Sequence, residues 1–397
     1  MTGMTEPSLP LTPAREFADE VKIAETTSLL VLQGTTFCNL NCSYCYLPHR
    51  SRRDQMSPET VAASLQNLDE SQLLGERLTV LWHAGEPLTL PKAYYRNALK
   101  LIARFSDERR AIRSSIQTNG TLIDAGFCDL FKEFKVRVGV SLDGPKALND
   151  SCRQTRSGRG TYDATMRGIR RLQQAKLDYY VITVLTSSSL DAPEQLYNFY
   201  REHGIRNVAF NIEEIEGVNT GSSLSQGRDD RRVGRFLERM YALTTRDSEI
   251  HVREFDQFEQ ILTNGELALS SSMNSPFQLV SVGANGDFST FSPELLGMKS
   301  EIYGDFIFGN VHNDRIVDIK EGKKFKKVFD DIKTGVTACS RKCQYFAVCG
   351  GGAPSNKLFE NGSFASGETM FCKFTKQAVA EAVLKYHESS PANSETE

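Results

Sequence analysis

Short apolar segments alternate with amphipathic ones along the first 220 residues of the chain. Six apolar runs rich in Val, Ile, Leu and aromatic residues predict buried strands at 28–33, 78–82, 112–118, 136–142, 179–185 and 208–212. Helical patterns lie between them, and the first opens at Ser57-Pro58-Glu59, an N-cap followed by a proline and an acidic first turn. Six strand–helix units predict an α/β fold with a parallel sheet curled as a barrel or partial barrel. A doubly wound Rossmann sheet is the competing architecture, but no G-x-G-x-x-G follows the first strand.

The pattern changes after residue 220. Residues 221–235 are rich in Ser, Gly and charge, which predicts a linker, and two helical patterns follow. Alternating strands around Asn285-Gly286 predict a hairpin, and a closing helix is expected over 375–386. The expected organisation is a mobile N-terminal arm over 1–27, a barrel over 28–220, a linker with helices over 221–275, a smaller C-terminal domain over 276–388 and a disordered tail over 389–397.

Composition narrows the class of protein. The 397 residues carry a formal net charge of −3, so the chain has no basic surplus for binding nucleic acid. No apolar run approaches membrane-spanning length, and the N-terminus lacks a secretion signal. These features predict a cytoplasmic protein with no nucleic-acid or membrane partner. Nine cysteines in such a protein favour metal or redox use over disulfides, and seven of them fall within 38–45 and 339–372.

The first cysteine set is Cys38-x3-Cys42-x2-Cys45, directly after the first predicted strand. Three thiolates can hold three irons of a [4Fe–4S] cube and leave the fourth iron open to a small molecule with an amine and a carboxylate. The alternative is a zinc site with His49 as the fourth ligand. The spacing favours the cluster.

Further polar groups follow the other predicted strands, and chemistry in an α/β barrel sits at the carboxyl ends of the strands. Gly85 and Glu86 after the second strand suit an ammonium group, and Ser141 after the fourth suits a ribose. Arg153 lies downstream and suits a carboxylate. Each alone is as easily a turn residue, a helix N-terminal acid or a surface arginine. Together, opposite three cysteines, they describe a site for S-adenosylmethionine (SAM).

These motifs resemble those of the radical SAM superfamily. The resemblance covers about residues 28–215 and implies a partial (β/α)6 TIM barrel whose cluster cleaves SAM to a 5′-deoxyadenosyl radical. It implies that Cys38, Cys42 and Cys45 hold the cluster, that Tyr44 lies by the adenine, that Gly85 and Glu86 meet the methionine amine, that Ser141 meets the ribose and that Arg153 meets the carboxylate.

The second cysteine set is Cys339, Cys343, Cys349 and Cys372. Four cysteines can saturate one [4Fe–4S] cube or one zinc ion. The layout resembles the iron–sulfur (SPASM/twitch-like) domain of peptide-modifying radical enzymes, which often carries two auxiliary clusters. This chain departs from that pattern, because non-cysteine residues stand where an inner cluster would take its ligands: Ser289, Phe291, Ser292 and Ala353. We therefore expect one auxiliary [4Fe–4S] cluster.

A finer resemblance is to peptide maturases that form three-residue cyclophanes, the GrrM/OscB type, carried by 45–50, 83–88, 291–297 and 349–362. It implies a carbon–carbon crosslink between an aromatic ring and a β-carbon of a ribosomally made precursor peptide, with an electron donor of flavodoxin or ferredoxin type. Glu294 and Asp287 are candidates for the base or for substrate contacts. The alternatives are a sulfatase-maturating or other peptide dehydrogenase of the same superfamily, and a zinc-stabilised binding protein without catalysis.

Overall fold

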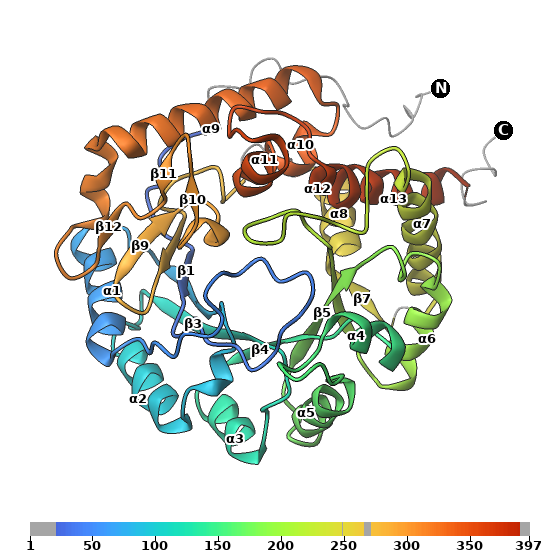
Figure 1. Cartoon of the computed structure of the whole chain (residues 1–397), viewed down its shortest axis with the longest axis horizontal. Helices are drawn as coiled ribbons and strands as arrows, with labels where there is room; N and C mark the ends of the chain where they lie inside the picture. Colours follow the sequence, from blue (N-terminus) through green and yellow to red (C-terminus); the bar gives the residue numbers. More distant parts are fainter. Residues whose placement is uncertain (1–20, 248, 266–270, 390–397) are drawn as a thin grey trace, which may run out of the picture.

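The computed structural model describes residues 21–247, 249–265 and 271–389 (Figure 1). Six strands lie close to their predicted ranges: β1 (Leu29–Leu32), β2 (Arg77–Trp82), β3 (Ala111–Thr118), β4 (Arg137–Ser141), β5 (Tyr179–Leu185) and β6 (Asn207–Ile212). Each pairs in parallel with the next. The α/β prediction with a mostly parallel central sheet is therefore confirmed. The strands form an arc in Figure 1, with helices on its outer side.

The helices on that outer side follow their strands in order: α1 (Pro58–Glu70), α2 (Lys92–Ala103), α3 (Ala125–Glu133), α4 (Lys146–Cys152), α5 (Tyr162–Gln174) and α6 (Pro193–Glu202). The predicted cap of α1 is confirmed, since the Ser57 side chain accepts the amide of Thr60 at 3.1 Å and Pro58 opens the helix. Asp124 caps α3 in the same way through the amide of Phe127 (2.9 Å). Local capping and apolar periodicity thus fix where these helices begin.

The C-terminal segment continues the same sheet. Its further strands are β7 (His251–Val252), β8 (Leu279–Val282), β9 (Asp287–Thr290) and β12 (Gly309–Asn310). The hairpin β8–β9 turns at Asn285-Gly286 as predicted, and β8 pairs in parallel with β1. Within the described residues the sheet order is β12-β9-β8-β1-β2-β3-β4-β5-β6-β7. The boundary expected at residue 276 therefore falls inside a continuous sheet.

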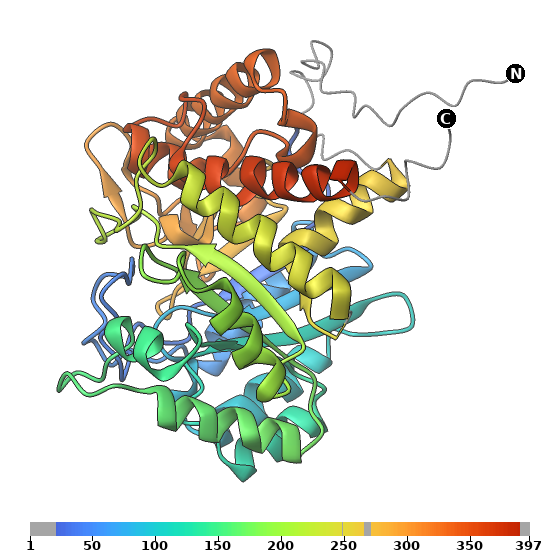
Figure 2. The same ribbon diagram turned by 90° about the vertical axis from the view of Figure 1, so that its right-hand side faces the viewer.

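Helices and one small ribbon complete the C-terminal half: α7 (Asp230–Asp247), α8 (Arg253–Asn264), β10 (Lys299–Ser300), β11 (Gly304–Asp305), α9 (Lys323–Lys342), α10 (Phe346–Cys349), α11 (Pro354–Asn361), α12 (Met370–Cys372) and α13 (Ala378–Ser389). Figure 2 shows α13 lying along α7, and the two helices are in contact. The linker expected through residue 235 was wrong in its second part, because α7 already begins at Asp230.

The described part of the expected N-terminal arm is packed against the rest of the chain. Val21 and Thr27 are buried, and the Thr27 hydroxyl donates to the carbonyl of Phe277 at 2.7 Å. Residues 1–20 of the expected arm and 390–397 of the expected tail lie outside the described residues.

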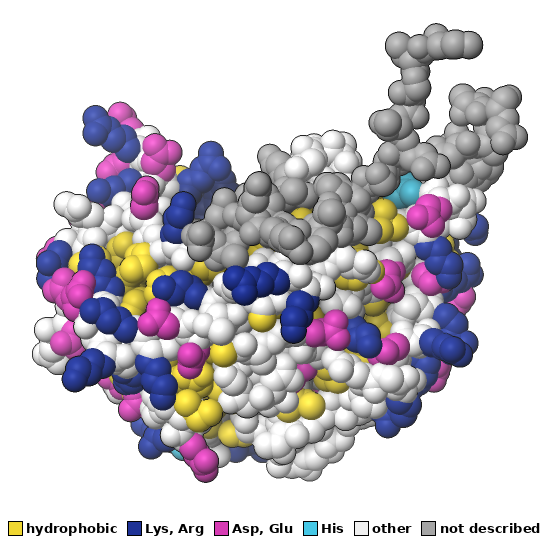
Figure 3. Space-filling model, turned by 90° about the horizontal axis from the view of Figure 1, so that it is seen from above, with side chains coloured by type: hydrophobic (Ala, Val, Ile, Leu, Met, Phe, Trp, Pro, Cys, Tyr) yellow, Lys and Arg dark blue, Asp and Glu magenta, His cyan; other side chains and the backbone are white. Residues whose placement is uncertain are grey.

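On the face seen in Figure 3, basic and acidic side chains are intermixed. Among the described helices, none has both the length and the apolar character needed to cross a membrane.

Candidate functional site

The loop between β1 and α1 carries the first three cysteines and lies in the middle of the arc of strands (Figure 1). The segment after α4 holds its backbone in place. The amide of Asn41 donates to the carbonyl of Gln154 at 2.8 Å, and Arg156 Nε donates to the carbonyl of Cys38 at 2.9 Å. The cysteine loop is thus fixed to the end of the fourth strand–helix unit.

Gly85 lets this loop pack directly on the end of β2. Its φ is +59°, and a Cβ at this position would lie 2.6 Å from the carbonyl oxygens of Thr35 and Phe37. The next amide, of Glu86, donates to the Phe37 carbonyl at 2.7 Å. A side chain at residue 85 would push the cysteine loop away, so glycine is required here for a close approach of two backbones.

One cavity of about 240 Å³ collects the groups expected around SAM. Its walls include the first three cysteines, Tyr44, Gly85, Glu86, Ser141, Arg153 and Glu294. These residues come from the ends of three strands (β1, β2 and β4), from the end of α4 and from the C-terminal segment, and the fold brings them to one space. The structure therefore groups all of the predicted SAM-site residues, whose individual roles stay predictions.

Arg153 is buried and pairs with a carboxylate of the chain itself. Its Nη2 lies 3.0 Å from Asp143 Oδ1, and its guanidinium lies 5.4 Å from the centre of the Tyr44 ring. The Tyr44 hydroxyl donates to the other oxygen of Asp143. The Nε of Arg153 is buried without a hydrogen-bond partner, which leaves one donor for an anion in the cavity.

Glu86 ties the end of β2 to the end of β3. Its carboxylate accepts the Thr118 hydroxyl at 2.6 Å and the amides of Asn119 and Leu88 at 2.7 and 2.9 Å. Burial raises the pKa of Glu86 to about 7, while these donors oppose that shift. The carboxylate therefore has a structural role in addition to the amine contact expected of it.

Gln117, which the sequence patterns did not single out, lines the cavity beside Ser141. Its Nε2 donates to the Ser141 hydroxyl at 2.9 Å, while its Oε1 is buried without a partner. Its position next to the end of β3 was the signal that could have found it.

Two further missed residues are Glu214 and Glu216, which follow β6 and line the same cavity as Glu294. Glu294 belongs to the short helix Pro293–Leu295 after the hairpin. The strand-end rule that selected Gly85 and Ser141 also applies to the residues after β6. The cavity therefore has an acidic wall that the sequence analysis describes only in part.

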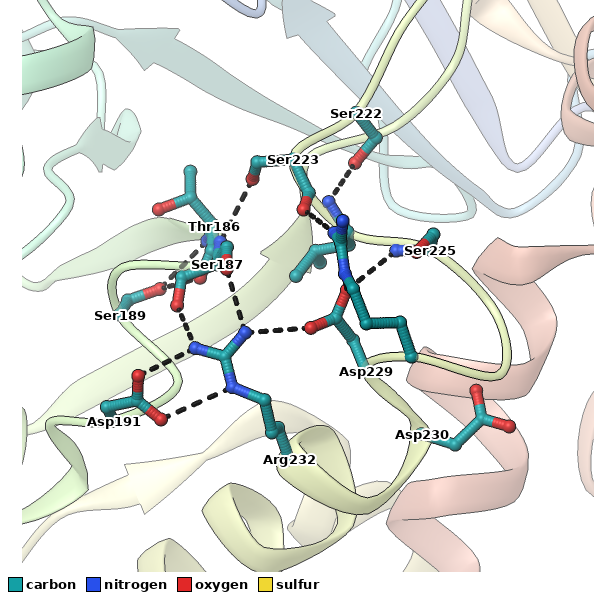
Figure 4. A network of polar contacts seen from close by, with 12 residues as sticks. Thr186, Ser187, Ser189, Asp191, Ser222, Ser223, Ser225, Asp229, Asp230 and Arg232 are labelled. Atoms are coloured by element: carbon teal, nitrogen blue, oxygen red, sulfur yellow. Dashed lines mark hydrogen bonds and ion pairs between the residues drawn. The ribbon is translucent and has the colours of Figure 1, made fainter.

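A polar network anchors the loop that carries these two glutamates (Figure 4). Arg232 of α7 donates to Asp229 and Asp191 at 2.8 and 2.7 Å, and to the carbonyl of Ser187 at 2.7 Å. Asp229 is fully buried and also accepts the amide of Ser225. The segment expected as a linker is thus bound to the end of β5.

Asp287 and His49 do not line the cysteine cavity. They line an adjoining cavity of about 600 Å³ that shares Leu47 and Gly85 with the first. Asp287 accepts the side-chain amides of Asn285 (2.6 Å) and Asn310 (3.0 Å). His49 lines the adjoining cavity and not the one lined by the three cysteines, which counts against it as the fourth ligand of the zinc alternative.

Burial makes Cys38 and Cys42 poor thiolates on their own. It raises the pKa of Cys38 to about 12 and that of Cys42 to about 11. Bound iron would supply the positive charge that stabilises the thiolates. In the described part of the chain, no three His, Cys, Asp or Glu side chains converge on one metal ion. A cluster suits this arrangement better than zinc, because each thiolate then binds a different iron.

The second cysteine set lines a separate cavity of about 450 Å³. Cys339 lies near the end of α9, Cys349 ends α10 and Cys372 ends α12, while Cys343 follows α9. Burial raises the pKa of Cys372 to about 12 and also raises those of Cys343 and Cys349. The four thiols therefore share one space, as a four-ligand site requires.

The chain is similar to several known proteins. A family model described as the radical SAM superfamily matches residues 32–200. An uncharacterized protein of Synechocystis sp. is 42% identical over 385 residues, which cover 95% of this chain and 97% of that protein. A serine-type anaerobic sulfatase-maturating enzyme of Bacteroides thetaiotaomicron is 24% identical over 358 residues, or 85% of this chain and 84% of that enzyme.

Two solved structures share the fold. The structure of anSMEcpe with bound AdoMet and Cp18Cys peptide aligns with a TM-score of 0.74 at 20% identity, covering 93% of this chain and all of that chain. Streptococcus suis SuiB bound to precursor peptide SuiA aligns with a TM-score of 0.63 at 17% identity, covering 88% of this chain and 76% of that one.

Proposed function

We propose that this chain, which matches the radical SAM superfamily over residues 32–200, modifies a ribosomally made precursor peptide by forming a carbon–carbon crosslink. The crosslink joins an aromatic ring to the β-carbon of a nearby residue, which closes a three-residue cyclophane. The observation that carries the proposal is the cavity that combines three cysteines, the strand-end polar groups and an acidic wall.

The match to the radical SAM superfamily implies a [4Fe–4S] cluster and SAM, and the residues that line the first cavity fit both. Cys38, Cys42 and Cys45 would hold the cluster, which supplies a 5′-deoxyadenosyl radical from SAM. The buried, unpartnered Arg153 Nε and Gln117 Oε1 leave one donor and one acceptor for a polar ligand. In this proposal Arg153 meets the methionine carboxylate, Gly85 and Glu86 the amine, Ser141 the ribose and Tyr44 the adenine.

We further propose one auxiliary [4Fe–4S] cluster on Cys339, Cys343, Cys349 and Cys372, in a SPASM/twitch-like segment beside a partial (β/α)6 barrel. The residues that replace inner-cluster ligands are packed. Ser289, Phe291 and Ser292 are fully buried, and Ser292 accepts the amide of Ser355 at 3.3 Å. Because side chains fill the place where an inner cluster would bind, the packing supports one auxiliary cluster and not two.

The crosslink removes a hydrogen atom from the β-carbon, and one electron and one proton from the ring. Glu294 is our candidate for the proton acceptor, because it lines the cysteine cavity and burial raises its pKa to about 7. Asp287 lies in the adjoining cavity, where it suits contacts to the rest of the peptide. An extended peptide can bind by adding to a sheet edge, and a flavodoxin or ferredoxin would supply electrons in the cytoplasm.

A second candidate is a dehydrogenase of the sulfatase-maturating type. Similarity to a sulfatase-maturating enzyme over 85% of the chain supports it. Coexpression with a candidate precursor peptide, chosen as a short Gly-rich and aromatic reading frame next to the gene, followed by mass spectrometry, separates the two. We expect a loss of two hydrogens per ring closed and no backbone fragments inside the crosslinked segment. Full fragmentation there, or modification of a neighbouring sulfatase instead, would contradict the cyclophane proposal.

A further inference from the structure

Three glutamates form one wall of the cysteine cavity. Glu214 and Glu216 come from the loop after β6, and Glu294 comes from the short helix after β9. Segments nearly 80 residues apart therefore bring three carboxyl groups to one space. We call them the acidic wall.

The acidic wall is poorly compensated by the chain itself. Glu214 accepts the side-chain amide of Asn356 at 2.8 Å. Glu216 is only 4% exposed, and its Oε1 is buried with no hydrogen-bond partner. A buried carboxylate oxygen without a donor is costly, and native structures rarely leave one unexplained.

Burial and mutual repulsion act together on these groups. They raise the pKa of Glu214 to about 8 and raise that of Glu216 well above its usual range. No described lysine, arginine or histidine forms an ion pair with any of the three glutamates. Arg232, which holds the same loop, pairs with Asp191 and Asp229 instead. Without a cation these carboxyl groups therefore favour the protonated, neutral form near pH 7, and a cation placed among them would favour their ionised form.

A metal ion does not fit the acidic wall well. Within the described ranges, no three acidic, histidine or cysteine side chains converge closely enough to hold one ion. A guanidinium is larger and planar, and its five N–H donors can reach carboxylates that are spread apart. An organic cation therefore matches the wall better than a metal does.

We propose that the acidic wall binds a cationic side chain of the peptide substrate, an arginine by preference, next to the residues that react. This inference rests on the proposed function, because it assumes that a peptide enters the cavity. The cation would donate to Glu216 Oε1 and neutralise the repulsion among the three carboxyl groups. It would also favour the ionised form of Glu294.

The test compares two acetylated and amidated peptides, Gly-Phe-Gly-Arg-Gly and its citrulline counterpart, which differ in one charge and hardly in shape. Binding to the reconstituted, SAM-loaded enzyme is measured by calorimetry without reductant, so that no turnover occurs. We expect the arginine peptide to bind at least tenfold more tightly.

Substitutions then locate the effect. Glu216→Gln and Glu214→Gln should each bring the arginine-to-citrulline ratio toward one. Glu213→Gln is the matched control, because Glu213 lines the same cavity but accepts the amide of Ser223 at 2.8 Å; its ratio should stay as in the unmodified enzyme. Circular dichroism checks that each variant is folded. If one variant unfolds, the affinities of the unmodified enzyme for the arginine and citrulline peptides still test the proposal.

Equal binding of the two peptides, or binding of neither, overturns the inference. So does a preference for arginine that survives both Glu216→Gln and Glu214→Gln. The proposed function is judged separately by the mass of the precursor. Crosslinking without an arginine preference would defeat only the cation site, and an arginine preference without crosslinking would defeat only the crosslink.

Discussion

The two cysteine cavities differ most in the charge of the groups around them. The first has three cysteines and is lined by Glu86, Glu213, Glu214, Glu216 and Glu294, with Arg153 as its guanidinium. The second has four cysteines and is lined by Lys342, Lys357 and Lys376, with Glu368 as its carboxylate. A cluster becomes more negative when it is reduced, so nearby anions oppose reduction and nearby cations favour it.

This difference in charge suggests that clusters at the two sites would have different roles. A cluster beside carboxyl groups in their ionised form would be the stronger reductant, which is what cleavage of a sulfonium needs. A cluster among lysines holds an electron more readily and has no free iron for a small molecule. We therefore expect the first site to start the reaction and the second to accept or relay electrons.

The largest effect expected is loss of SAM cleavage when the first site is broken. Cys38→Ala removes one of three thiolates, so 5′-deoxyadenosine formation in the presence of reductant should fall to background, measured by chromatography. Cys128→Ala is the control, because Cys128 is buried in α3 and lines neither cysteine cavity. Unchanged cleavage in Cys38→Ala would contradict the assignment of the first site.

The next largest effect expected is a change in the number of irons bound per chain, which distinguishes the two cysteine sites. Anaerobically reconstituted protein should hold about eight irons per chain, for two cubes. Cys372→Ala should lower this to about four while SAM cleavage without peptide persists, since Cys372 lies in the second cavity. Colourless protein with bound zinc would instead support the non-catalytic alternative.

The acidic wall should give the crosslinking rate a pH dependence. A proton acceptor works only when it is deprotonated, and Glu294 has a pKa raised to about 7. The rate should therefore rise as the pH increases through about 7, in assays with the precursor peptide. Glu294→Gln should flatten this profile and lower the rate by about 10² or more. If the crosslinking rate became independent of pH in Asp287→Asn but kept its pH dependence in Glu294→Gln, the proton acceptor would be Asp287 and not Glu294.

Much of the first cavity follows from local sequence signals. Apolar runs and caps predict the six strand–helix units, and the strand-end rule then predicts that Gly85, Ser141 and the cysteines meet. The same rule reaches Glu214 and Glu216, which were missed because charged residues before a Ser-rich and Gly-rich segment suggest a solvated linker.

Long-range pairing was harder to predict. The contact of β8 with β1 joins residues about 250 positions apart, and no local pattern encodes it. α9 was missed for a different reason, because its many lysines mask the apolar stripe of Phe325, Val328 and Ile332. The pairing of Arg153 with Asp143 likewise depends on the folded sheet.

The smallest effect expected is a shift in the reduction potential of the auxiliary cluster proposed at the second cysteine set. Lys357 is 3% exposed and its Nζ is buried without a hydrogen-bond partner, so its charge is little screened. Lys357→Met should lower the midpoint potential by on the order of 70 mV, the energy of one unit charge about 10 Å away at an effective dielectric constant of about 20. Redox titration followed by electron paramagnetic resonance measures it. Lys342→Met is the matched control, because Lys342 lines the same cavity but is exposed to solvent, and its shift should be smaller. Equal shifts in the two variants would show that burial of Lys357 does not set the potential, and the contrast between the cavities would then rest on the acidic wall alone.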